Sequence, residues 1–236
     1  MSAVFTVYGK ELRHYFVSPI GYILIALYWC ASGFFFSFGT VFISAIDMVN
    51  AFHNISLLLL LMMPFISMRL FAEERTTNTL ELLFALPIGI PSIVLGKYLA
   101  LMTILFLMLA GSTSAVAVLL AFGEPDLGPI IGGYLGVLFI GSAFAAIGIL
   151  ASSLVSNQIL AAALAWFVLI GFWFIDYLTI LVPDSSLILL IRHLSFSVQY
   201  LDLIRGVLDI NALAYFFAIT LVALTLSASV IAMKRG

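Results

Sequence analysis

The chain has 236 residues, of which 64% are apolar and 8% are charged, and its mean hydropathy is +1.27. No soluble domain of this size has such a composition, so lipid must be the solvent for most of the chain. The net charge of −2, with nine Lys and Arg in total, leaves no basic surface able to follow a phosphate backbone, which excludes a nucleic-acid partner.

Residues 1–18 are expected to form an interfacial helix. Between residues 3 and 17 the apolar side chains recur at helical spacing, whereas Lys10, Arg13 and His14 lie off that stripe. Such an amphipathic helix is expected to lie on the inner leaflet of the membrane. The residues of the apolar stripe are Val4, Tyr8, Leu12, Tyr15 and Phe16.

Six stretches are long enough to cross a bilayer, which requires about twenty apolar residues. The region between Asp126 and Asp176 contains no charge and provides two crossings, joined by a polar turn that includes Ser152, Ser153 and Asn157. The expected fold is therefore all-α and polytopic, in one domain that covers residues 1–236. The six expected spans are 20–43, 49–70, 93–122, 128–152, 158–181 and 212–233.

The distribution of basic residues predicts the orientation. An even number of spans places both termini on one side. If that side is the cytoplasm, seven Lys and Arg lie inside and only Arg192 and Arg205 lie outside, as the positive-inside rule requires. We expect a multi-pass protein of the bacterial inner membrane with both termini in the cytoplasm.

Residues 73–88, between the second and third spans, form the most charged stretch of the chain. Asn78 followed by Glu81 resembles a capping box, and the helix that it begins would have about two turns. So short a helix needs a surface to pack against, either the membrane or another protein. A plain solvated loop is the alternative. The apolar face of this helix comprises Leu80, Leu83 and Phe84.

Residues 183–211, between the fifth and sixth spans, are too long for a turn and too apolar to be disordered. Two short outer helices are expected, at 187–194 and 197–205, and Ser197 would cap the second helix while Gly206 ends it. Both helices are expected to press back onto the outer mouth of the bundle.

The chain lacks the residues of an enzyme or an ion-coupled carrier. The span centres carry no ionisable group, and Asp176 is placed near the outer surface as an interfacial anchor. Gly9-Lys10 and Gly96-Lys97 lack the rest of a phosphate-binding loop and are interpreted as ordinary interfacial pairs. The scattered histidines predict no metal site. We therefore expect no catalytic residue and no cofactor, and any driving energy must come from a partner.

Several motifs resemble those of the ABC-2 type permeases, and within them the branch of the gliding-motility-associated and nitrous-oxide-reductase-maturation permeases. The resemblance covers essentially the whole chain and specifies no substrate. Asn78 departs from the family pattern, which has glycine before Thr79, but Asn also tolerates a left-handed backbone. The matching segments are Lys10–Leu12, Tyr15–Phe16, Ser18–Tyr22, Met68–Glu74, Thr79–Leu83, Pro87, Leu95–Lys97 and Arg205–Asp209.

The resemblance implies a permease subunit that moves a substrate across the inner membrane, driven by a separate ATPase subunit that holds ATP and Mg²⁺. Residues 73–88 would be the coupling helix in a cleft of that ATPase. A second permease half, identical or related, would complete the membrane part. Membrane lipid is a further expected partner, and the apolar faces of the outer helices would allow a periplasmic accessory protein to cover them. A non-transporting membrane scaffold coupled to an ATPase is the alternative. The implied docking residues are Glu73, Glu74, Arg75, Asn78, Thr79, Leu80, Glu81, Leu83 and Phe84.

Overall fold

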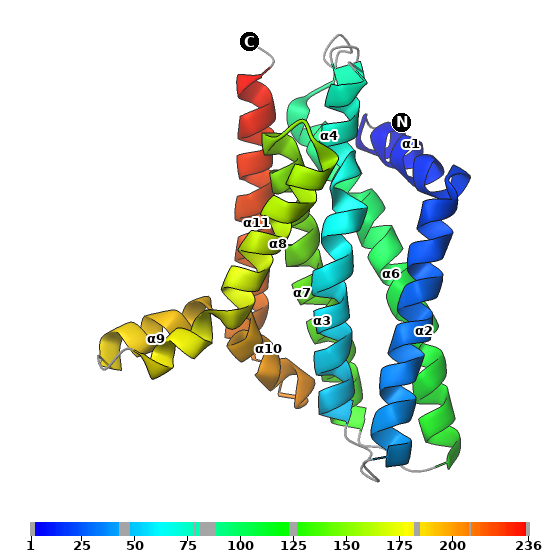
Figure 1. The fold of residues 1–236 in the computed structure, drawn as a ribbon, viewed down its shortest axis with the longest axis vertical. Helices are drawn as coiled ribbons and strands as arrows, with labels where there is room; N and C mark the ends of the chain where they lie inside the picture. The colour runs from blue at the N-terminus through cyan, green and yellow to red at the C-terminus, as the bar shows by residue number, and fades with distance from the viewer. Residues whose placement is uncertain are drawn as a thin grey trace.

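A computed structural model describes residues 3–42, 48–77, 79–80, 88–122, 127–181, 185–207 and 209–234, and all regular structure in these ranges is helical. The all-α prediction is therefore confirmed. Long helices run side by side along the longest axis of the molecule (Figure 1). The elements are α1 (Ala3–Val17), α2 (Pro19–Phe42), α3 (Met48–Ser67), α4 (Arg69–Thr76), α6 (Ile90–Phe122), α7 (Leu127–Leu154), α8 (Gln158–Phe174), the 3₁₀-helix η1 (Ile175–Ile180), α9 (Ser185–Leu194), α10 (Phe196–Ile204) and α11 (Ile210–Met233).

Six helical stretches in the described ranges are long and apolar enough to cross a membrane, which confirms the predicted number of spans. The second stretch continues through α4 to Thr76, beyond the expected end at residue 70. The third begins at Ile90 and not at residue 93, because Pro91 fits the first turn of a helix, where its missing N–H is not needed. The stretches are Pro19–Ser37, Val49–Thr76, Ile90–Val118, Leu127–Leu154, Gln158–Ile180 and Ile210–Met233.

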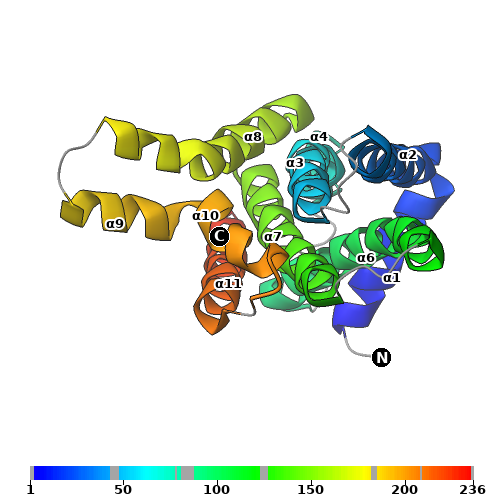
Figure 2. The same cartoon turned by 90° about the horizontal axis from the view of Figure 1, so that it is seen from below.

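Helix α7 occupies the centre of the bundle and packs against α3, α6, α8, α10 and α11 (Figure 2). In the most apolar stretch of α7, 78% of the residues are buried, compared with 28% in the corresponding stretches of α2, α8 and α11. These three helices therefore present most of their surface outward. Glycines allow the close packing of α7: a Cβ atom at Gly148 would lie 2.0 Å from the Ser67 Oγ, and one at Gly133 would lie 2.3 Å from the Phe52 ring.

Helix α1 packs against α6 and α2. Its most buried residues are Val7, Glu11 and Tyr15, at a spacing of four residues. The predicted stripe was therefore centred on the wrong residues: except for Tyr15, its members flank the buried line and are half-buried. The apolar pattern failed because a glutamate occupies a core position. Gly96 permits the close approach of α6, since a Cβ there would lie 2.8 Å from the Val7 Cβ.

The two short helices between the fifth and sixth spans behave differently. Helix α10 packs on α7 and α8 and buries Phe196, Tyr200, Leu203 and Ile204. Helix α9 is bent away from α10 by 68° and extends from the bundle beside η1 (Figures 1 and 2). The prediction that both helices press onto the bundle is correct for α10 and wrong for α9.

The cap of α10 also differs from its prediction. Ser195, and not Ser197, accepts the hydrogen bond from the Val198 N–H. The Ser195 hydroxyl also donates to the Asp176 carboxylate at 3.2 Å, which ties η1 to the start of α10. As expected, Gly206 follows the end of α10. Its φ of +84° is a left-handed conformation, which glycine adopts without steric cost.

Candidate functional site: a buried ion cluster

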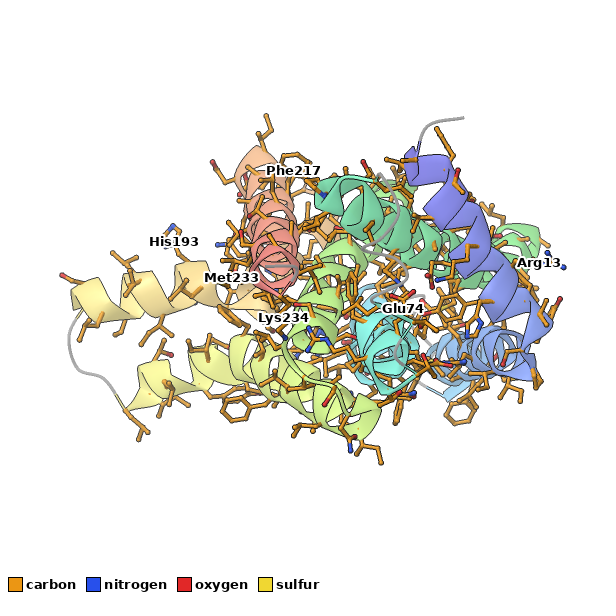
Figure 3. The ribbon with its side chains drawn as sticks, turned by 90° about the horizontal axis from the view of Figure 1, so that it is seen from above. Arg13, Glu74, His193, Phe217, Met233 and Lys234 are labelled. Atoms are coloured by element: carbon orange, nitrogen blue, oxygen red, sulfur yellow. The ribbon has the colours of Figure 1, made fainter. Side chains whose placement is uncertain are left out.

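Helix α1, helix α4 and the last turn of α11 lie at the same end of the bundle, which we name the termini end (Figure 1). Glu74 lies in the interior of this end, whereas Arg13 lies at its rim (Figure 3). Several charged side chains from distant parts of the sequence meet here, from α1, α4, α6 and the end of α11. The termini end is therefore where polar interactions, and not apolar packing alone, hold the spans together.

Lys97 is the central residue of these interactions. Its side chain comes from α6 and is only 1% exposed. The ammonium donates to the Glu11 Oε1 at 2.8 Å and to the Leu70 carbonyl at 2.6 Å, and the Glu74 Oε1 lies at 3.0 Å. The three protons of the ammonium thus face three oxygens, which is the condition for burying a lysine in its charged form.

Glu11, Glu74 and Lys10 complete the cluster, and with Lys97 these residues are named the ion cluster. Lys10 donates to the Glu74 Oε1 at 2.7 Å and lies 3.6 Å from the Glu11 Oε1. Burial lowers the pKa of Lys10, but the hydrogen bond and the charge of Glu74, together with the charge of Glu11, outweigh it and raise that pKa. Two cations and two anions balance, so α1, α4 and α6 are joined by a cluster with no net charge.

Ser152 attaches α4 to the central helix α7. The Ser152 hydroxyl donates to the Met68 carbonyl at 2.9 Å and accepts from the N–H groups of Phe71 and Ala72, at 3.0 and 3.1 Å. These backbone groups lie at the break between α3 and α4, where helical hydrogen bonds are incomplete. Since Ser152 is fully buried, no solvent replaces it.

The last carbonyls of α7 accept hydrogen bonds from cationic side chains of two other segments. Arg75, on α4, donates to the carbonyls of Ser153 and Leu154. Lys234, which follows α11, donates to the same two carbonyls at 3.0 and 3.2 Å. Burial, and then the nearby charge of Arg75, lower the pKa of Lys234. Positive charge at a helix C-terminus is favourable, so this contact fixes α4 and α11 to the end of α7.

The structure describes five of the nine residues expected to dock a partner. Glu73, Glu74 and Arg75 lie on α4, which begins before the expected start at residue 73. Glu74 is 9% exposed and Leu80 is 8% exposed, so both face the chain itself. Thr79 is exposed and bonds to the Thr77 hydroxyl at 2.9 Å. Asn78, Glu81, Leu83 and Phe84 lie outside the described residues.

Sequence reasoning missed Glu11 and Lys97. Gly96-Lys97 was predicted to be an ordinary interfacial pair, which is wrong because Lys97 is buried and paired. A signal existed in the spacing: Glu11 lies four residues from both Val7 and Tyr15, in line with a buried stripe. A carboxylate in such a position requires a cationic partner. The spacing does not say which cation that is.

The fold defines the class of this protein, a multi-pass helical membrane protein. A family described as ABC-2 family transporter protein matches residues 12–172, which is more than half of the chain. The chain belongs to this family, whose members are membrane-spanning permease subunits of ABC transporters, are not catalytic themselves and work with an ABC ATPase. No curated protein matches the chain significantly.

Proposed function

We propose that this chain moves a substrate across the inner membrane by a conformational change that a separate ATPase subunit drives. In this proposal α4 and residues 77–87 dock on the ATPase, which faces the termini end from the cytoplasm and holds ATP and Mg²⁺. A second permease half, identical or related, completes the membrane part. The observation that carries the proposal is the attachment of α4 to α1, α6 and α7 through the ion cluster and Ser152.

The attachment makes α4 suitable for transmitting force. Separating Lys97 from its carboxylates would leave charges buried without partners, at a cost of about 3–5 kcal/mol. The bonds of Ser152 add about 1–3 kcal/mol if their backbone partners are left unsatisfied. Since α4 continues from α3 in one span-length stretch, a displacement of α4 reaches the second span directly and three other helices through these contacts.

The docking residues divide into two groups in this proposal. Glu74 and Leu80 hold the docking segment to the bundle, as their burial supports. Glu73 and Thr79 are more exposed and are available to orient the partner by charge and hydrogen bonding. Arg75 is partly exposed but donates to the carbonyls of Ser153 and Leu154, so in this proposal it holds α4 to α7 at the edge of the docking surface. Asn78, Glu81, Leu83 and Phe84 stay predicted contacts, with Leu83 and Phe84 expected to supply the apolar part of the interface.

The proposal is tested by purifying the chain, co-expressed with its genomic neighbours, through a tag and identifying the subunits that remain bound. We expect an ATP-binding subunit with the wild type and its loss with Leu83→Asp. Val17→Asp is the matched control, because Val17 is an exposed apolar residue (76%) at the end of α1, outside the docking segment. If the wild type binds no ATPase, the energy source is absent and the proposal fails in favour of a scaffolding or passive role.

A further inference from the structure

A groove of about 650 Å³ runs between α2 and α3 and reaches the start of α8. Its walls are almost wholly apolar, and Leu24 and Leu27 of α2 face Leu58, Leu61 and Phe65 of α3 across it. The part of the groove beside α4 and the start of α8 is lined by three polar residues, Arg69, Glu73 and Gln158. An apolar groove with a polar part is the shape required for a molecule with an apolar chain and a polar head.

The apolar part of the groove corresponds in length to the hydrocarbon core of one leaflet. Leu58 and Arg69 are eleven residues apart on the nearly continuous α3–α4 stretch. At about 1.5 Å per residue this is about 16 Å, and half of a hydrocarbon core of about 30 Å is about 15 Å. The polar residues lie toward the termini end, where α4 and the start of α8 are, so they are placed at the depth of a lipid headgroup.

The polar part of the groove carries both signs of charge. The Arg69 Nε donates to the Glu73 Oε2 at 3.0 Å, and the Arg69 Nη2 donates to the His14 Nε2 at 2.8 Å. The Arg69 Nη1 is buried and has no hydrogen-bond partner among the described residues. The Glu73 carboxylate is 31% exposed, and its Oε1 lies 3.9 Å from the His14 Nε2. A guanidinium with an unused donor thus lies beside a partly open carboxylate.

This arrangement selects among lipid headgroups. A phosphodiester would pair with the Arg69 guanidinium, while a primary ammonium would pair with Glu73 and donate to the Gln158 amide oxygen. A purely anionic headgroup would place its charge beside Glu73 and would bring no cation of its own to pair with that carboxylate. A trimethylammonium group has no N–H to donate. The charge pattern therefore fits a zwitterionic headgroup with a primary amine.

We propose that this groove is a binding site for one phosphatidylethanolamine, with an acyl chain between α2 and α3 and the headgroup at Arg69, Glu73 and Gln158. Glu73 belongs to both proposals, but Leu27 and Leu61 line the groove outside the docking segment, so variants of these two residues test lipid binding without altering ATPase docking. A lipid bound there contacts both α2 and the α3–α4 stretch and stabilises their present arrangement.

The test uses native mass spectrometry of the purified full chain after delipidation. Phosphatidylethanolamine, phosphatidylcholine and phosphatidylglycerol with identical acyl chains are added back one at a time. We expect one phosphatidylethanolamine per chain, retained about tenfold more than either of the other lipids. Glu73→Gln should reduce its retention to that of phosphatidylcholine.

Leu27→Trp should abolish the retained lipid by filling the groove, and Leu61→Trp repeats the test from α3. Leu221→Trp is the matched control, since Leu221 has a similar exposure (49%, compared with 54% for Leu27) but lines a different groove, between α6, α7 and α11. Equal retention of the three lipids, or unchanged retention in both filled variants, would mean annular lipid only and would overturn the proposal. If a filled variant no longer binds a second copy of the chain but still retains the lipid, the groove is a contact between two chains and the lipid proposal is wrong.

Discussion

The Lys97 Nζ lies 2.8 Å from the Glu11 Oε1, although 86 positions separate the two residues in the sequence. Lys97 belongs to the third span and Glu11 to the helix that precedes the first span. The Glu74 Oε1 lies 3.0 Å from the same nitrogen and brings in α4, the helix that follows the second span. One ammonium therefore holds three segments that the sequence presents as unrelated.

Replacing Lys97 with methionine should destabilise the protein strongly. Methionine keeps most of the volume but leaves two buried carboxylates with Lys10 as their only cluster cation, at an expected cost of about 3–5 kcal/mol. Denaturant unfolding in detergent, followed by helical circular dichroism, measures this cost. A loss below about 1 kcal/mol would show that the cluster is not a structural joint.

A compensated variant separates charge imbalance from general damage. Lys97→Met combined with Glu11→Gln leaves the Lys10–Glu74 pair, whose charges balance. We expect the double variant to be more stable than Lys97→Met alone, because no unpaired carboxylate remains buried. If the two losses simply add, the residues do not interact as the structure places them.

Gly96→Ala should displace α1 from α6. The added Cβ would lie 2.9 Å from the Val4 carbonyl oxygen as well as 2.8 Å from the Val7 Cβ, so backbone must move. We expect a loss of about 1–3 kcal/mol and faster proteolysis within α1. Gly171→Ala is the control, because nothing lies within 4 Å of its Cβ position and alanine favours a helix. Equal behaviour of the two variants would contradict the tight contact.

Ser152→Ala should weaken the joint between α4 and α7. The variant leaves the N–H groups of Phe71 and Ala72 without their acceptor, at an expected cost of about 1–3 kcal/mol. Ser229→Ala is the control, since the Ser229 hydroxyl is exposed and bonds to the Thr225 carbonyl in its own helix. Thermal unfolding of the two variants in the same detergent gives the comparison. A control that loses as much stability as Ser152→Ala would count against the assigned role.

Alkaline pH should loosen α1. Tyr15 donates to the Ile66 carbonyl at 2.6 Å, and burial, followed by the charge of Glu11, raises its pKa. The unfolded chain therefore releases the Tyr15 proton above about pH 10 while the folded chain keeps it, and stability falls as pH rises. The raised pKa of Lys10 acts in the same direction: its contribution is full below its unfolded pKa of 10.5 and is lost as pH rises through the folded value.

Tyr15→Phe provides the check on the alkaline effect. It should lower the melting temperature at pH 7, because the Ile66 carbonyl loses its donor, and it should reduce the decline above pH 10. Melting temperatures between pH 7 and 11 measure both effects. If the melting temperature of the variant falls above pH 10 as steeply as that of the wild type, groups other than Tyr15 cause the alkaline loss of stability.

Much of the fold could be predicted because the bilayer restricts the possibilities. Apolar segments of about twenty residues, separated by charged or polar stretches, must be helices, since every backbone polar group in lipid needs an internal partner. Composition and length therefore determined the all-α class and the number of spans. Gly206 after α10 is likewise a local signal, because its positive φ depends only on neighbouring backbone.

The candidate site depended on the tertiary structure. Glu11 and Lys97 each have a local pattern, but neither pattern identifies the helix face that it will meet. The direction of α9 was undetermined for the same reason, since the 68° bend between α9 and α10 forms where Ser195 bonds to Asp176 on another element. The sequence determined which segments are helices, because helix formation in lipid is local, whereas the pairing of buried charges was decided by tertiary packing, because it depends on contacts between residues far apart in the chain.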